Sequence, residues 1–229
     1  MDFVEGEILA FDKPYRWTSF DVVGKVRWLL CRKLGIKRLK VGHTGTLDPL
    51  ATGVVVVCTG RKTKQIDSLQ QHVKEYVATL QLGATTPSFD LEKPVDATWP
   101  TGHITRELIN SVLPRFRGEI WQVPPVFSAV KVEGKRAYAY ARKGEEVELQ
   151  PKLLVIDELE VLDFEPATMQ LTLRIVCSKG TYIRALARDI GQALGSGAHL
   201  TALRRTRVGG IRVEDCLSFP AFEQMLAEL

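Results

Sequence analysis

The sequence predicts an α+β (mixed α/β) protein with one large, mixed and mostly antiparallel sheet flanked by helices. Segments 75–82 and 169–177 alternate apolar and polar residues, as strands with one buried face do. The apolar run 54–58 is typical of a strand buried on both faces. Segments 18–34 and 181–194 instead repeat apolar residues at helical spacing. With 229 residues, of which 45% are hydrophobic and 25% charged, the chain can form a large globular core.

The first half of the chain begins with a helix that Thr18 and Ser19 cap and Gly35 ends. Its apolar face should comprise Val22, Val23, Val26, Leu29 and Leu30. A loop at 42–53, rich in Gly, Thr and Pro, precedes the buried strand at 54–58. After the alternating strand, residues 84–103 contain several prolines and a glycine, so we expect them to form a connecting loop.

The second half should begin with a helix over 105–116, followed by a segment that Pro124, Pro125 and Gly134 interrupt. Residues 138–143 could form a short basic helix. Two strands, 153–164 and 169–177, lead to a helix that we expect Thr181 to cap. On that helix Arg184 and Arg188 are one turn apart, on a different face from the apolar residues. A strand over 200–208 and a helix over 220–229 complete the chain.

Composition and spacing exclude several classes of protein. No apolar stretch is long enough to span a bilayer, and the N-terminus has no signal-peptide pattern, so we expect a cytoplasmic protein. The four cysteines and four histidines are scattered, and no C-x-x-C pair occurs. We therefore expect free, mostly buried thiols and neither a disulfide framework nor a zinc site.

The net charge of +4 is small, but the basic residues are concentrated in two segments. Residues 25–40 contain seven basic residues and no acid, and residues 179–212 contain seven more beside a single acid, Asp189. Such segments suit a polyanion that is bound through its phosphates, although solvated helix and strand faces would look the same.

The most informative segment is the loop GHTGTLDPLATG at 42–53. It does not fit a phosphate-binding P-loop, because it follows a helix, precedes a strand and has no lysine; GRKT at 60–63 has the wrong glycine spacing. The loop offers one carboxylate, Asp48, which Pro49 makes rigid and small residues leave accessible to another molecule. Asp before Pro is also ordinary turn chemistry, so the residues alone leave both interpretations open.

The whole loop resembles the motif G-[HA]-x-G-x-L-D-P-x-A-[ST]-G of TruB-type tRNA pseudouridine synthases, over twelve positions. The resemblance continues in order along residues 5–210. It includes DKP at 12–14, TS at 18–19, KEY at 74–76, QVPPVFSAVK at 122–131, GTYIR at 180–184 and HLTALRRT at 199–206. It implies the pseudouridine-synthase fold in a single catalytic domain over 1–229, with an RNA-gripping insertion at 122–150.

The resemblance implies conversion of uridine to pseudouridine at position 55 in the T-loop of tRNA, without cofactor or metal. The base must be flipped out of the RNA before it can react. By the same resemblance Asp48 is the nucleophile and Arg184 keeps it ionised, while Tyr76 stacks on the uracil and moves a proton at the end of catalysis. Attack at C1′, attack at C6 and a glycal route stay open.

Further roles follow from the same resemblance. His43 would occupy the space that the extruded base leaves, Tyr182 would contact the substrate, and Leu203 would form an apolar pocket wall. The cations that would contact RNA phosphates are Lys13, Arg204, Arg205 and Arg207.

Two departures from the family pattern are visible. Phe127 stands where relatives usually have tyrosine, and the chain stops too early to hold a C-terminal PUA domain. Two alternatives therefore stay open: an enzyme that acts on uridines in other RNAs, and a non-catalytic RNA-binding or tRNA-folding protein. We expect a monomer that binds the tRNA T-arm and no membrane.

Overall fold

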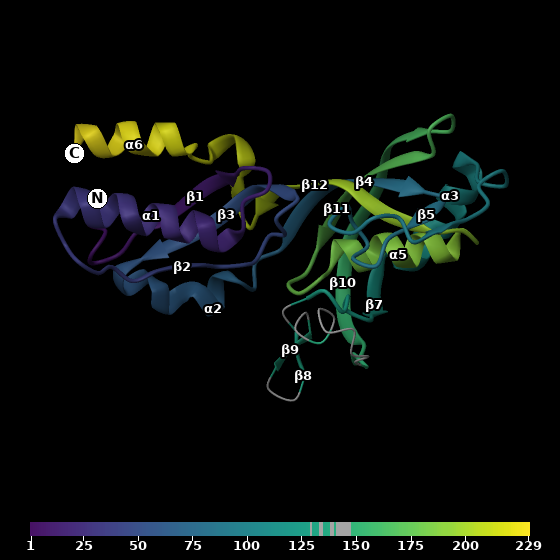
Figure 1. The fold of residues 1–229 in the computed structure, drawn as a ribbon, viewed down its shortest axis with the longest axis horizontal. Helices are drawn as coiled ribbons and strands as arrows, with labels where there is room; N and C mark the ends of the chain where they lie inside the picture. The colour runs from purple at the N-terminus through teal and green to yellow at the C-terminus, as the bar shows by residue number, and fades with distance from the viewer. Residues whose placement is uncertain (129, 133–134, 138–139, 141–147) are drawn as a thin grey trace. The chain divides into compact units, whose positions relative to one another are not determined.

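A computed structural model describes residues 1–128, 130–132, 135–137, 140 and 148–229 (Figure 1). The basic helix expected at 138–143 lies outside the described residues apart from residue 140. The same holds for much of the expected insertion at 122–150. Within the described part of the chain, no helix is long and apolar enough to cross a membrane.

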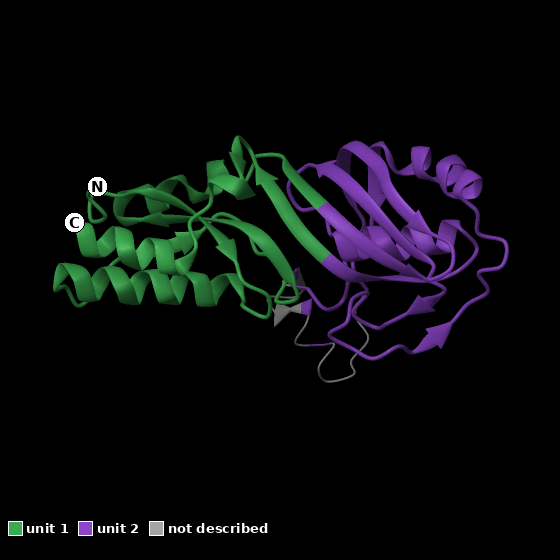
Figure 2. Cartoon of the chain, turned by 90° about the horizontal axis from the view of Figure 1, so that it is seen from above, with its two compact units in different colours: residues 1–76, 203–229 green, residues 77–202 purple. Residues whose placement is uncertain are grey.

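The chain forms two compact units, which Figure 2 shows in different colours. Unit 1 comprises residues 1–76 and 203–229, and unit 2 comprises residues 77–202. Strands β4 (Lys74–Leu82) and β12 (Ala198–Val208) each have residues in both units. A nine-stranded sheet has the order β1-β3-β12-β4-β11-β10-β7, with β2 paired to β3 and β13 to β12.

The pairing in this sheet is mixed. β3 and β12 pair in parallel. The antiparallel pairs are β1 with β3, β2 with β3, β7 with β10, β10 with β11, and β12 with β13. This confirms the predicted fold class. The pattern follows from the sequence, because β4 buries every second residue and β3 is buried along nearly its whole length.

In unit 1 the strands are β1 (Ile8–Lys13), β2 (Val41–His43), β3 (Ala51–Thr59) and β13 (Ile211–Arg212). The helices are α1 (Ser19–Leu34), η1 (Gly60–Gln65), α2 (Ile66–Leu69), η3 (Val213–Asp215) and α6 (Phe219–Glu228). The fully buried Phe11 of β1 stacks on Phe219 at 5.2 Å and meets the edge of Phe222 at 5.1 Å between ring centroids. These aromatic contacts fix the C-terminal helix to the first strand.

Helix α1 begins and ends where its sequence predicts. The Thr18 hydroxyl accepts the Asp21 N–H, and the Asp21 carboxylate accepts the Thr18 N–H, which forms a capping box. Gly35 ends the helix in the left-handed conformation, with φ 64°. Ser19 is therefore the first helical residue rather than a second cap, and its side chain is buried.

Unit 2 contains β5 (Ala84–Thr85), β6 (Ala97–Thr98), α3 (Arg106–Val112), η2 (Leu113–Phe116) and β7 (Gly118–Gln122). It continues with β8 (Lys131–Val132), β9 (Lys135–Arg136), β10 (Lys152–Glu165), β11 (Gln170–Cys177) and α5 (Ile183–Ala193). The expectation of a plain loop at 84–103 is wrong in one respect, because Ala84 and Thr85 pair with Thr98 and Ala97. Strands of two residues are too short for alternation to reveal them.

The predicted cap of α5 is also wrong. The N-cap is Tyr182, which makes no side-chain cap bond, and the Thr181 hydroxyl instead donates to the Ser178 carbonyl at 3.0 Å. Thr181 thus closes the turn before the helix. The apolar face of the helix is confirmed, since Ile183, Leu186, Ala187, Ile190 and Leu194 are all buried.

The cysteines fit their prediction in part. All four are free thiols, but only Cys58 and Cys177 are buried, while Cys31 and Cys216 are half-buried. Burial raises the pKa of the Cys216 thiol to about 11, so this side chain stays protonated at neutral pH.

Gly53 is required where β3 passes β12. Its φ is 108°, and an added Cβ would lie 2.1 Å from the Arg205 carbonyl oxygen. We expect Gly53→Ala to lower the free energy of unfolding by more than about 2 kcal/mol, because both the backbone conformation and the close contact disfavour a side chain. Gly24→Ala is the control: nothing lies within 4 Å of its Cβ position in the middle of α1. In urea unfolding the control should be at least as stable as the parent protein. If Gly53→Ala were as stable as Gly24→Ala, Gly53 would not be required at this position.

Candidate active site

Asp48 lies in the loop that joins β2 to β3. His43 pairs with Val57, and the Thr44 N–H donates to the Val56 carbonyl at 2.9 Å, so the strand pairing extends to the base of the loop. The Asp48 carbonyl accepts the Ala51 N–H at 3.0 Å. This turn places the half-buried Asp48 just before β3.

Two buried side chains bind the backbone of the loop before Asp48. Arg205, 2% exposed, donates to the carbonyls of Gly45 at 3.2 Å, Thr46 at 3.3 Å and Val54 at 2.7 Å. The Ser19 hydroxyl accepts the Leu47 N–H at 2.8 Å and lies 3.3 Å from the Leu47 carbonyl oxygen. The backbone is therefore held at the three residues that precede Asp48.

Lys13 binds the loop just after Asp48. Its ammonium group, fully buried at the end of β1, donates to the carbonyls of Trp17 at 2.5 Å, Pro14 at 3.1 Å and Pro49 at 3.3 Å. Burial lowers the pKa of Lys13 to about 8, while the negative charge of Asp48 acts in the opposite direction. Below that pH Lys13 is a cation in the electrostatic range of Asp48.

The burial of Lys13 and Arg205 corrects the expectation that they contact RNA phosphates: their donors are aimed at backbone carbonyls inside unit 1. Arg204 and Arg207 are partly exposed. Arg204 pairs with Asp12 at 2.7 Å, and Arg207 approaches Glu75 at 3.7 Å. A phosphate contact by these two stays a prediction.

Three other predicted site residues belong to unit 1. His43 is half-buried at the end of β2, and burial together with the charge of Arg205 lowers its pKa, so its ring is neutral at pH 7. Leu203 pairs in parallel register with Ala51, which brings it beside the end of the Asp48 loop. Tyr76 is 7% exposed in β4, on the face that also buries Ala78.

Arg184 is buried in unit 2, in the first turn of α5. It is 5% exposed and donates to the carbonyls of Ser88 at 3.1 Å and Phe127 at 3.0 Å. Its Nε lies 3.8 Å from the carboxylate of Asp90, which is itself 5% exposed. One turn later Arg188 donates to the Val123 carbonyl at 3.0 Å, so both arginines bind the segment that follows β7.

Asp90 is one residue that the sequence does not reveal, because residues 84–103 are predicted only as a connecting loop. Its neighbour Phe89 has φ 62°, an uncommon conformation for a bulky residue. The Phe89 carbonyl accepts the Leu200 N–H at 2.9 Å, and the Arg188 guanidinium lies 5.0 Å from the Phe89 ring centroid. No local sequence pattern shows that a loop carboxylate is buried. The burial of Asp90 becomes evident only from its contact with Arg184, which is distant in the sequence.

Gln122 was also missed as a support for Tyr182. It is 1% exposed, and its amide accepts the Tyr182 N–H at 2.9 Å and donates to the Tyr182 carbonyl at 3.2 Å. The two bonds fix the backbone of Tyr182, two residues before Arg184. Asp48 and Arg184 belong to different units, so the pairing predicted for them stays a prediction.

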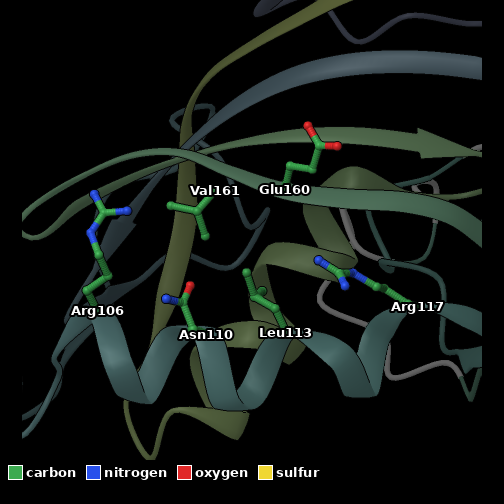
Figure 3. A pocket seen from close by; sticks show the side chains of 6 residues that line it. All are labelled: Arg106, Asn110, Leu113, Arg117, Glu160 and Val161. Carbon is green, nitrogen blue, oxygen red and sulfur yellow. The ribbon is translucent and has the colours of Figure 1, made fainter.

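Among the described residues, no group of three or more His, Cys, Asp or Glu side chains could hold a metal ion. A separate pocket in unit 2 has a volume of ≈ 380 Å³ and lies between α3, η2 and β10 (Figure 3). Two of its charged groups have partners: Arg117 donates to the Leu159 carbonyl at 2.7 Å, and Glu160 pairs with Arg174 at 3.0 Å. It contains no predicted site residue.

Known protein families match nearly the whole chain. A sequence profile described as "TruB family pseudouridylate synthase (N terminal domain)" matches residues 32–183. A second, "tRNA pseudouridylate synthase B C-terminal domain", matches residues 184–228.

Three relatives share the name "tRNA pseudouridine synthase B". The protein of Phocaeicola vulgatus is 66% identical over 99% of this chain and 95% of its own length. The protein of Bacteroides thetaiotaomicron is 63% identical over 99% and 95%, and that of Chlorobium luteolum is 51% identical over 93% and 73%.

Two solved structures share the fold. One, "Crystal Structure of a Cbf5-Nop10-Gar1 Complex", has a TM-score of 0.71 and 31% identity over 97% of this chain. The other, "Structure of H/ACA RNP bound to a substrate RNA containing 2'-deoxyuridine", has a TM-score of 0.68 and 28% identity over 97%. The chain spans about half of each, 54%.

The buried Lys13 predicts a specific dependence of stability on pH. Its pKa is about 8 in the folded protein, against an ordinary value of 10.5. The unfolded chain therefore binds more protons between these values, and the Lys13 contribution to stability rises with pH in this window. We expect Lys13→Met to lose that rise, up to about 3 kcal/mol, in urea unfolding from pH 7.5 to 10.5. Lys64→Met, at an exposed position, serves as control, and its free energy of unfolding should change with pH as that of the parent does. If Lys13→Met also followed the parent, the pH dependence could not be assigned to Lys13.

Proposed function

Because the chain belongs to the TruB family of pseudouridylate synthases, we propose that it isomerises uridine to pseudouridine at position 55 in the T-loop of tRNAs. At the coarser level the chain is a tRNA pseudouridine synthase, an isomerase. The observation that carries the finer proposal is the loop of Asp48, whose backbone Lys13, Ser19 and Arg205 hold on both sides.

The reaction breaks the N1–C1′ bond, turns the base and forms a C5–C1′ bond; a proton leaves C5 and one is gained at N1. It needs no net oxidation or reduction and no external group, so we expect neither cofactor nor metal. An ionised carboxylate can divide the exchange into two easier steps. Asp48 has this role in the proposal, by attack at C1′ or C6 or by opening a glycal route.

Asp48 has to be ionised in a pocket from which the substrate displaces water. Desolvation favours the neutral acid, and nearby cations favour the carboxylate. Within unit 1 the buried ammonium group of Lys13 lies in the electrostatic range of Asp48. We propose that Arg184 supplies a second cation, and that its bonds to Ser88 and Phe127 orient the guanidinium for this contact.

The remaining residues would receive the flipped nucleotide. Unstacking a base costs a few kcal/mol, which contacts in the pocket must offset. We propose that Tyr76 stacks on the uracil, that Tyr182 contacts the nucleotide and that Leu203 forms an apolar wall. We propose that His43 occupies the place in the RNA stack that the flipped base leaves. Its ring is neutral at pH 7, and a neutral ring costs less to desolvate than a charged one.

The proposed partner is the T-arm of tRNA, read more by shape than by sequence. Arg204 and Arg207 remain candidates for phosphate contacts, and the segment 122–150 remains the candidate RNA-gripping insertion in a single catalytic domain. A cytoplasmic, monomeric enzyme stays our expectation. Action on uridines of other RNAs is the alternative, while the family assignment disfavours a non-catalytic binder.

The role of Asp48 is tested by Asp48→Asn with unmodified tRNA as substrate. We expect the parent to form pseudouridine at position 55 and the variant to form none, because the amide is no nucleophile. The exposed Asp67→Asn in α2 is the control and should match the parent. Modified positions are mapped by chemical probing and sequencing. An active Asp48→Asn variant would remove Asp48 from its role, and product elsewhere would change the target.

Arg184→Lys tests the cation in unit 2. Lysine keeps the charge but loses the planar fork that reaches two carbonyls, so turnover should fall by about 100-fold or more. RNA affinity, measured by filter binding, should stay within about threefold of the parent, since the fold and the exposed cations are unchanged. The exposed Arg106→Lys serves as control. Unchanged turnover in Arg184→Lys would show that this geometry is not needed.

A further inference from the structure

Unit 1 has a cationic surface that the proposed function does not use. We propose that six side chains, here called the distal patch, bind the phosphate backbone of the tRNA outside its T-arm. They are Lys33, Lys37, Arg38, Lys40, Lys62 and Lys64. The inference rests on the proposed function, since it assumes that uridine 55 is bound at Asp48.

The distal patch forms where two segments meet that are separate in the sequence. Residues 32–40 contain five cations and residues 60–65 contain three, with no acid in either segment. The Gly60 N–H donates to the Lys40 carbonyl at 2.9 Å, and Val41 pairs with Thr59, so the fold aligns the two segments side by side. The buried Leu39 anchors the first segment.

The six side chains are available for a ligand. Five of them are exposed and Lys62 is half-buried. None of the six has an ion pair among the described residues, whereas two neighbouring cations are engaged: Arg61 pairs with Glu5 at 3.0 Å, and Arg32 lies 5.4 Å from the Trp28 ring centroid. The patch therefore has more positive charge than the protein itself neutralises.

Two elements of unit 1, α1 and β3, connect the patch to the loop of Asp48; Figure 1 shows their backbones. Helix α1 begins at Ser19, which binds the residue before Asp48, and ends at Leu34 beside the patch; its 16 residues span about 24 Å. Strand β3 begins at Ala51 near Asp48 and ends at Thr59 beside the patch; its nine residues span about 30 Å. Both elements place the patch far from the reacting nucleotide.

Phosphate backbone is the ligand that fits such a surface. The six cations are spread over a helix end and two chain segments, and five of them are exposed, which suits an array of phosphates more than a single small anion. At this distance, RNA that reaches Asp48 through its T-loop must continue well beyond the loop to touch the patch. A folded tRNA extends in this way, whereas an isolated T-arm hairpin offers only one short helix.

The test compares two RNAs with one charge-neutralised variant. The variant takes two residues from each segment: Lys37→Gln, Arg38→Gln, Lys62→Gln and Lys64→Gln. For full-length unmodified tRNA we expect affinity to fall by about tenfold at 0.1 M salt, and the slope of log K against log salt to flatten by about 2 to 4. For an isolated T-arm hairpin we expect unchanged affinity and unchanged conversion of uridine 55.

A matched control removes four exposed cations outside the patch: Arg106→Gln, Arg115→Gln, Lys152→Gln and Arg212→Gln. We expect this control to bind both RNAs like the parent. Three outcomes would overturn the proposal. The variant and the control could lose the same affinity, the variant could lose the same affinity for tRNA as for the hairpin, or its affinity for tRNA could be unchanged. A loss of binding to phosphatidylserine vesicles with unchanged tRNA affinity would overturn it as well. Failure of the parent to modify the hairpin and tRNA would instead contradict the proposed function.

Discussion

The loop that carries Asp48 depends on two buried cations that bind its backbone carbonyls. Lys13 ends β1 and Arg205 lies in β12, and these strands flank β3 in the sheet. A buried cation without partners destabilises a protein by several kcal/mol. The carbonyls of Gly45, Thr46 and Pro49 must therefore stay in place for unit 1 to be stable. The loop is thus held by the same interactions that stabilise the fold, which is what an acid that acts at a fixed point requires.

This arrangement explains why the loop motif could be found in the sequence while its supports could not. The loop residues are consecutive, whereas Lys13 and Arg205 lie 36 and 160 positions from the carbonyls they bind. A charged residue in a sequence is interpreted as exposed, because burial of charge is rare. Both were therefore assigned to RNA phosphates, and Asp90 in unit 2 was not noticed for the same reason. Long-range pairing decides each of these roles.

Features with local causes were predicted well. The alternation in β4 and β11 and the start and end of α1 depend on residues a few positions apart, and the structure confirms them. The cap of α5 fails because Thr181 has two local choices, to accept from the helix or to donate to the Ser178 carbonyl, and the turn takes the second. The family resemblance added the roles of Asp48, Arg184 and Tyr76, which no local signal establishes.

The cations of this chain divide into two physical classes, and net charge alone hides the division. Lys13, Arg184 and Arg205 are buried and bonded to carbonyls, so bulk salt has little access to their interactions. The distal patch is exposed, and ions screen it and compete for it. Raising the salt concentration therefore weakens contacts to the RNA backbone without loosening the loop of Asp48. On the proposals made above, affinity for RNA and the geometry of the acid depend on different cations, so one can change without the other.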